Sequence, residues 1–231
     1  MNIWQVPLDL DAARVEQLEA LLSQDERDRA GRFRRGADRL RFVAAHAALR
    51  LILSKTVGTP AAQLGFVYGP AGKPSLAEAP GGPPFFSMSH SGDCALVAVF
   101  DDAPVGVDLE MLAHAAEHAL DLVDLFTAAE LAEIEAAPGA QRPLASYRCF
   151  VRKEALLKAA GCGLGLGVDQ ITVSTGAQAR LVDSQHGDIE AGAWSLHALD
   201  EPGVWTGAVA VRGPMPDITA RPWDWELETT A

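Results

Sequence analysis

The spacing of apolar residues predicts helices in the first quarter of the chain. Apolar positions recur at helical intervals across residues 10–57, and Gly58 and Pro60 end the pattern. Beyond this point the chain changes to short runs of β-branched and aromatic residues separated by glycine and proline, which is typical of strands. The runs are 66–68, 85–88 and 94–100.

The same order, helical material followed by strands, recurs in the second half. The sequence from Thr127 to Glu130 has the form of a capping box, which predicts a helix start. A longer helix is expected at about 145–160, stopped by Gly161, and the proline-rich tail from Gly213 is expected to be irregular. Strands are expected at 105–110, 171–174, 194–198 and 204–211. No sequence repeat is visible, so any two-fold relation would lie in the order of elements.

Composition excludes several classes of protein. Of 231 residues, 48% are hydrophobic and 22% are charged, which is typical of a globular protein and not of a disordered or fibrous one. Three cysteines without CxxC spacing indicate reduced thiols in a cytoplasmic protein, and neither a disulfide framework nor a structural zinc site is expected. No segment approaches the ~20 apolar residues needed to cross a bilayer.

The net charge is -12, but it is unevenly distributed. Eight arginines and two acids between Arg27 and Arg50 give a local balance of +6, which leaves −18 for the other residues. The overall charge argues against nucleic acid and membrane surfaces as partners. The arginine excess suits a small anion, because the planar guanidinium matches phosphate geometry, although most of these arginines could simply cover a solvated helix face.

Two segments carry candidate metal ligands. On an extended strand from Val105, Asp108 and Glu110 project to one face about 7 Å apart, which suits Mg²⁺, although two solvated acids explain the same pattern. On the helix at 145–160, Glu154 and Lys158 lie one turn apart. They form either an exposed ion pair or, if the carboxylate faces the strand acids, a third ligand with an ammonium group beside it.

Two further segments are less specific. The run from Phe86 to Gly92 places Ser89 beside His90 at a strand end, without the G-x-S-x-G elbow of a hydrolase. These groups suit hydrogen bonding to phosphate, or the histidine is a buried structural residue. Gly72-Lys73-Pro74 reads as a glycine turn with one lysine.

Taken in order, GKP, FSMSHS, VGVDLE and FVRKEALLKAAGCGL, spaced over residues 72–164, closely resemble the motifs of the 4′-phosphopantetheinyl transferases, specifically the surfactin-synthetase-activating (Sfp-type) branch. The resemblance implies an α+β fold, a pseudo-dimer of two similar α/β halves, each a helix packed on a small antiparallel sheet, with coenzyme A in the cleft between them. The halves would be residues 1–103 and 104–231. Many relatives have tryptophan where this chain has Phe150.

The implied reaction is the Mg²⁺-dependent transfer of 4′-phosphopantetheine from coenzyme A to a serine hydroxyl of an apo acyl or peptidyl carrier protein, releasing 3′,5′-ADP. The implied metal ligands are Asp108, Glu110 and Glu154. The implied contacts to coenzyme A are Lys73 and Pro74 at the adenine, Ser89 and His90 at the phosphates, Lys158 at the pyrophosphate and leaving group, and Arg41, Arg27 and Arg29 at the 3′-phosphate. Glu154 would take the serine proton, directly or through a metal-bound water.

Two other functions fit the same residues: a coenzyme A or nucleotide sensor without catalysis, and a metal-dependent phosphoesterase. The residues do not select among polyketide, nonribosomal peptide and fatty-acid carriers. A carrier-contacting apolar surface is expected near residues 122–126 and Leu131. We expect a cytoplasmic monomer, because a pseudo-dimer already contains both sides of its cleft.

Overall fold

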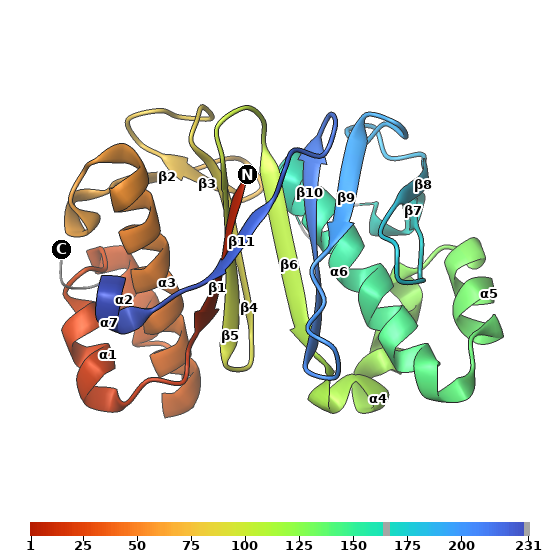
Figure 1. Ribbon diagram of the computed structural model, residues 1–231, viewed down its shortest axis with the longest axis horizontal. Coiled ribbons are helices and arrows are strands. Elements are labelled where there is room, and N and C mark those ends of the chain that lie inside the picture. The colour runs from red at the N-terminus through yellow and green to blue at the C-terminus, as the bar shows by residue number, and fades with distance from the viewer. Residues whose placement is uncertain (164–166, 229–231) are drawn as a thin grey trace.

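Two β-sheets lie against each other at the centre of the protein, and helices cover the outer face of each (Figure 1). The computed structural model describes residues 1–163 and 167–228. Leu164, the last residue of the fourth sequence motif, lies outside the described residues. The predicted α+β class is confirmed.

The first half builds one outer helical layer and the sheet beneath it. The segment predicted to be helical, 10–57, is confirmed as three helices, separated where Ser23 begins a capping box with Glu26 and where the chain turns before Gly36. The longest helix ends at Gly58, whose φ of 75° favours glycine. The elements are β1 (Asn2–Pro7), α1 (Ala12–Glu19), α2 (Gln24–Ala30), α3 (Gly36–Val57), β2 (Phe66–Tyr68), β3 (Pro74–Leu76), β4 (Phe85–Ser91) and β5 (Cys94–Phe100).

The second half repeats helices and strands around the long helix α6. The capping box is confirmed, because Thr127 and Glu130 bond each other's backbone N–H groups at the start of α5. Helix α6 ends at Gly161, which has a φ of 74°. The elements are β6 (Val105–Met111), α4 (Ala115–His118), α5 (Ala128–Ala136), α6 (Arg142–Ala160), β7 (Ile171–Val173), β8 (Leu181–Ser184), β9 (Trp194–Ala198) and β10 (Trp205–Arg212).

The C-terminal tail returns to the first half. Strand β11 (Thr219–Pro222) pairs in parallel with β1, and α7 (Trp225–Glu228) follows it. Trp223 and Trp225 are buried in the core beneath α1 and α3. The expectation of an irregular tail was therefore wrong for these two elements, because the tail's tryptophans have an apolar core to enter.

The sheets have the strand orders β11-β1-β5-β4 and β6-β10-β9. Apolar residues fill three spaces: between the first sheet and α1 and α3, between the two sheets, and between the second sheet and α6. Strands β4 and β6 lie side by side where the halves meet (Figure 1). No helix in residues 1–163 and 167–228 combines the length and apolarity that a membrane span requires.

Candidate active site

Alternate serines of β4 link the two halves. Because side chains on a strand alternate, Ser87, Ser89 and Ser91 share one side of β4 and reach β6. The hydrogen bonds run from Val107 N to Ser87 Oγ (3.1 Å), from Ser89 Oγ to Asp108 Oδ1 (2.6 Å) and from Ser91 Oγ to Glu110 Oε2 (2.7 Å). The FSMSHS motif therefore fixes the positions of the two strand acids.

The structure brings the β6 acids together with the acid and the lysine of α6. Lys158 Nζ lies 2.6 Å from Asp108 Oδ1 and 2.9 Å from Ser89 Oγ. Glu154, one turn earlier, lies close enough to Asp108 and Glu110 for their charges to act on its pKa. The sequence motifs at 105–110 and 152–161 therefore form one cluster of three carboxylates and one ammonium group.

Gly106 allows α6 to approach this closely. A Cβ placed on Gly106 would lie 2.1 Å from Ala155 O and 2.3 Å from Ala159 N, both main-chain atoms of the helix. Close packing of α6 on β6 therefore explains why Gly106 has no side chain and why the facing residues of α6, Ala155 and Ala159, are small. Helix and strand touch backbone to backbone, which holds Glu154 and Lys158 over the acids of β6.

The carboxylates are held where a negative charge is costly. Burial first, and then the charges of Asp108 and Glu110, raise the pKa of Glu154 to about 7, although Lys158 opposes the rise. Burial also raises the pKa of Glu110, against a hydrogen bond from Ser91. Asp108 Oδ2 is buried and has no hydrogen-bond partner within the described part of the chain. Carboxylates with pKa values shifted in this way by burial and by each other are typical of functional sites.

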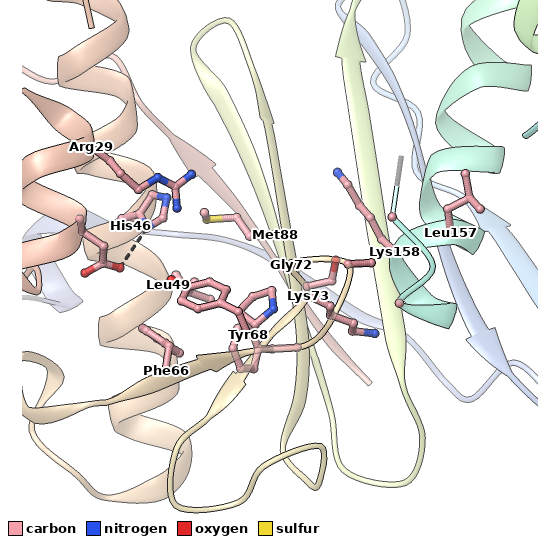
Figure 2. A pocket seen from close by; sticks show the side chains of 17 residues that line it. Arg29, His46, Leu49, Phe66, Tyr68, Gly72, Lys73, Met88, Leu157 and Lys158 are labelled. Carbon is pink, nitrogen blue, oxygen red and sulfur yellow. Dashed lines mark hydrogen bonds and ion pairs between the residues drawn. The ribbon is translucent and has the colours of Figure 1, made fainter. Parts of the chain in front are cut away.

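A cavity of about 300 Å³ opens beside this cluster and is lined by both halves (Figure 2). Arg29 and His46, from α2 and α3, lie at one side, and Lys158 lies across the cavity from them. Phe66, Tyr68 and Pro74 add apolar lining. Basic groups around an apolar floor suit a ligand that carries both phosphates and a planar base.

Known proteins are similar to this chain, and the matched residues include the carboxylate cluster. A family model described as the 4′-phosphopantetheinyl transferase superfamily matches residues 104–210. The 4′-phosphopantetheinyl transferase HetI of Nostoc sp. is 34% identical over 216 residues, which cover 92% of this chain and 88% of that protein. The chain belongs to the 4′-phosphopantetheinyl transferase superfamily.

Two Bacillus transferases are also similar to this transferase. The 4′-phosphopantetheinyl transferase psf-1 of Bacillus pumilus is 32% identical over 171 residues, 72% of this chain and 70% of that protein. A 4′-phosphopantetheinyl transferase of Bacillus subtilis is 29% identical over 193 residues, 82% of this chain and 81% of that protein. The predicted Sfp-type resemblance and the predicted reaction class, phosphopantetheinyl transfer, are confirmed.

The GKP lysine of the transferase ties the halves together. Lys73 Nζ donates hydrogen bonds to Ala159 O (2.7 Å) and Val105 O (3.2 Å), which belong to α6 and β6. Burial lowers the pKa of Lys73 to about 8, and a smaller influence of Cys162 opposes this. The stem of Lys73 and the ring of Pro74 line the cavity, while the ammonium group holds the β2–β3 turn against α6.

The three predicted phosphate-binding arginines lie in different places. Arg29 lines the cavity. Arg27 donates hydrogen bonds to Leu22 O and to Gln24 Oε1 (3.2 Å). Arg41 Nε lies 2.7 Å from Asp93 Oδ1, and Nη1 lies 3.5 Å from Asp38 Oδ1. The structure therefore brings Arg29, of these three, to the cavity wall.

His90 lies in a positively charged part of the transferase. The side chain is exposed near the end of β4. Its pKa is nevertheless lowered, first because neighbouring protein atoms partly desolvate the ring, and then because His46, Lys158 and Arg41 carry positive charge. An anion placed among these groups would be stabilised by the same charges that make a protonated His90 unfavourable.

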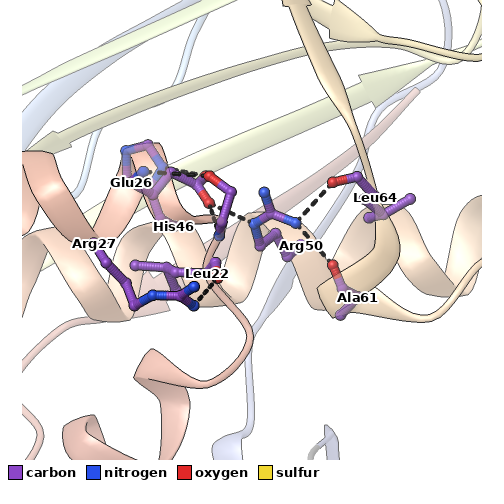
Figure 3. A network of polar contacts seen from close by, with 8 residues as sticks. Leu22, Glu26, Arg27, His46, Arg50, Ala61 and Leu64 are labelled. Atoms are coloured by element: carbon purple, nitrogen blue, oxygen red, sulfur yellow. Dashed lines mark hydrogen bonds and ion pairs between the residues drawn. The ribbon is translucent and has the colours of Figure 1, made fainter.

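A buried polar network supports the arginine side of the cavity and was missed from the sequence (Figure 3). Glu26 accepts hydrogen bonds from Arg50 Nε (2.7 Å) and contacts His46 Nδ1 (3.0 Å). Burial alone would raise the pKa of Glu26, but the bonds from His46 and the Ser23 backbone and the charge of Arg50 lower it to about 2. Ser23-x-x-Glu26 is a capping box, a sequence signal that could have located the carboxylate.

The lysine of the K-E-A segment has a structural role. Lys153 and Glu130 form an ion pair of 2.6 Å, with both side chains fully buried. Lys153 Nζ also donates to Leu125 O (2.7 Å) and Val168 O (3.0 Å). Lys153 therefore holds the chain around the second core, while its neighbour Glu154 belongs to the carboxylate cluster.

Proposed function

We propose that the protein uses Mg²⁺ to transfer the 4′-phosphopantetheine group of coenzyme A to a serine hydroxyl of an apo acyl or peptidyl carrier protein. One observation carries the proposal: Asp108, Glu110 and Glu154 meet Lys158 beside a cavity that both halves of the chain line. The reaction would release 3′,5′-ADP.

The acids fit Mg²⁺. This ion prefers oxygen ligands and usually keeps waters or substrate phosphates in its remaining positions. Asp108 Oδ2 is a buried carboxylate oxygen without a hydrogen-bond partner among the described residues, and Glu110 and Glu154 are the other two ligands in the proposal. When bound, Mg²⁺ would offset negative charge on the pyrophosphate oxygens.

Coenzyme A would lie along the cavity. The adenine would rest beside the stem of Lys73 and the ring of Pro74, while Ser89, His90 and Lys158 would contact the pyrophosphate. The lining supports this orientation, because Arg29 is at the wall opposite Lys158 and could meet the 3′-phosphate. Arg27 and Arg41 would join the 3′-phosphate only after leaving their present partners, Leu22 O and Asp93.

The transfer requires a group that accepts the serine proton and a positive charge that offsets the negative charge on the leaving oxygen. A neutral serine is a weak nucleophile, so its proton must leave as the oxygen bonds to the β-phosphorus. Glu154, with a pKa raised to about 7, is the proposed base. As the bond from phosphorus to the 3′,5′-ADP oxygen breaks, the Lys158 ammonium is placed to stabilise or protonate that oxygen.

We also propose a pseudo-dimeric organisation, with halves at 1–103 and 104–231. Each half has a long helix, α3 or α6, followed by strands, which supports this relation. A monomer would then contain the whole cleft. Cytoplasmic localisation remains a proposal, supported by three free cysteines, of which Cys94 and Cys149 are buried.

The carrier surface is proposed at residues 122–125 and Leu131. Val123 is exposed there, whereas Leu122, Leu125 and Leu131 are partly buried against the second core. Phe126, which was expected to join this surface, is buried in the core beneath α6 and so cannot contact a carrier in this conformation. The expectation of direct carrier contact therefore fails at Phe126.

Intact-mass analysis of apo acyl and peptidyl carriers tests the function. With coenzyme A and Mg²⁺, at least one carrier should gain a single phosphopantetheine, and a chelator should prevent the gain. The absence of addition on every carrier class would contradict the proposal. Release of phosphate from coenzyme A without any carrier would favour a phosphoesterase instead.

A further inference from the structure

Three metal-binding side chains meet outside the carboxylate cluster. Cys162 follows the glycine that ends α6, and His186 and Asp188 follow β8. One ligand atom from each lies within 4.8 Å of the other two. A thiol, an imidazole and a carboxylate from two separate segments therefore share one small volume near the protein surface.

We propose that Cys162, His186 and Asp188 form a Zn²⁺ site, with water as the fourth ligand. In a tetrahedral zinc site, bonds of about 2.3 Å to sulfur and about 2.1 Å to oxygen place these two atoms about 3.6 Å apart. The distance from Cys162 Sγ to Asp188 Oδ2 is 3.6 Å. Zn²⁺ would replace the thiol proton that now bridges them, and this proton would pass to solvent.

The His186 ring is positioned by close packing against Gly167, and its Nδ1 presents a lone pair. The backbone N–H of Asp188 donates a hydrogen bond of 3.2 Å to His186 Nδ1, which keeps this nitrogen unprotonated, as a metal ligand must be. The ring also packs closely against Gly167, where a Cβ would lie 2.8 Å from His186 Cδ2. Zn²⁺ at Nδ1 would displace this hydrogen bond, and the N–H of the exposed Asp188 would turn to water, while the contact with Gly167 would remain.

The donor types separate this site from the proposed Mg²⁺ site. Thiolate and imidazole select borderline-soft cations such as Zn²⁺ and Co²⁺, whereas an all-oxygen cluster suits Mg²⁺. Gly161 and Gly163, on either side of Cys162, line the cavity. Zn²⁺ would therefore join this part of the cavity wall to the loop after β8.

Cobalt titration of the full-length reduced protein tests the site. We expect a thiolate-to-cobalt charge-transfer band that saturates at one equivalent of Co²⁺ and is lost in Cys162→Ser. Because loss of a group that merely orients a ligand weakens metal affinity by about 10- to 100-fold, we expect His186→Gln and Asp188→Asn to weaken Co²⁺ binding by about 100-fold.

Two controls separate this site from others. Asp183→Asn, which removes an exposed acid of β8, should keep the band, and Asp108→Asn, which alters the carboxylate cluster, should keep it too. As a second measurement, Zn²⁺ should raise the Tm of the wild type by more than that of Asp188→Asn at the same concentration, and Asp188 is exposed, so the variant is expected to fold. No band in the wild type would overturn the proposal, and so would a band that His186→Gln and Asp188→Asn leave unchanged.

Discussion

Replacing Gly106 with alanine perturbs the contact that holds α6 against β6. The new Cβ would lie 2.1 Å from Ala155 O and 2.3 Å from Ala159 N, whereas real Cβ atoms essentially never come within 3.0 Å of another heavy atom. Both partners are main-chain atoms, so a change of rotamer cannot relieve the overlap. Helix and strand must separate by roughly 1 Å, and overpacking of this kind costs about 1–3 kcal/mol.

The same separation should reduce activity in molecules that still fold. Lys158 and Glu154 would move away from Asp108, and a displacement of about 1 Å costs on the order of 100-fold in rate. We expect a loss near 3 kcal/mol in the free energy of unfolding, measured by urea denaturation with tryptophan fluorescence. We also expect kcat for carrier modification to fall about 100-fold.

Gly36→Ala is the matched control. It adds the same methyl group in α3 where no heavy atom lies within 4 Å, so stability should stay constant or rise by up to about 1 kcal/mol. Adding Ala155→Gly to the Gly106 variant should not restore activity, because the overlap is with backbone. Wild-type stability and turnover in Gly106→Ala, or rescue by Ala155→Gly, would refute the reasoning.

Three further predictions concern the supports of the fold. Because the pKa of Glu26 is lowered from its ordinary value of 4.5 to about 2 in the folded protein, its contribution of about 3 kcal/mol to stability is present above pH 4.5 and is lost as pH falls toward 2. The free energy of unfolding, measured by urea denaturation across this range, should depend less steeply on pH in Glu26→Gln than in the wild type. An unchanged pH dependence would contradict this explanation. Lys73→Met should lower the free energy of unfolding by about 1–3 kcal/mol, because two carbonyls of the other half lose their donor; equal urea midpoints would contradict this. Trp225→Ala should cost about 3–5 kcal/mol by the same assay, whereas Leu227→Ala, at a side chain 72% exposed, should have little effect; similar losses in both would argue against burial as the cause.

Local patterns predicted the main elements well. The helical spacing before Gly58 and the alternation in β6 are properties of neighbouring residues, and burial of their apolar faces then fixed them. The strands β1 and β11 were not predicted, because they are stabilised by pairing with distant segments: β1 pairs with β5 and with β11. Long-range pairing leaves little trace in a local pattern.

The carboxylate cluster could be predicted only in part. Alternation placed Asp108 and Glu110 on one face, but their meeting with Glu154 depends on the backbone contact at Gly106, which is a tertiary feature. The arginine-rich segment predicted an anion-binding region, but it did not show which of its arginines would reach the cavity. Arg41 pairs with Asp93 because the two are brought together by folding, which the charge count could not reveal.

Single-turnover transfer to an apo carrier, followed by intact mass at saturating coenzyme A and Mg²⁺, tests the role of the cluster most directly. The wild type should add one phosphopantetheine. Glu154→Gln, which removes the proposed base, should be slower by about 100- to 10,000-fold. Glu135→Gln, at an exposed acid of α5, should match the wild type. Transfer by Glu154→Gln at the wild-type rate would contradict the proposed chemistry.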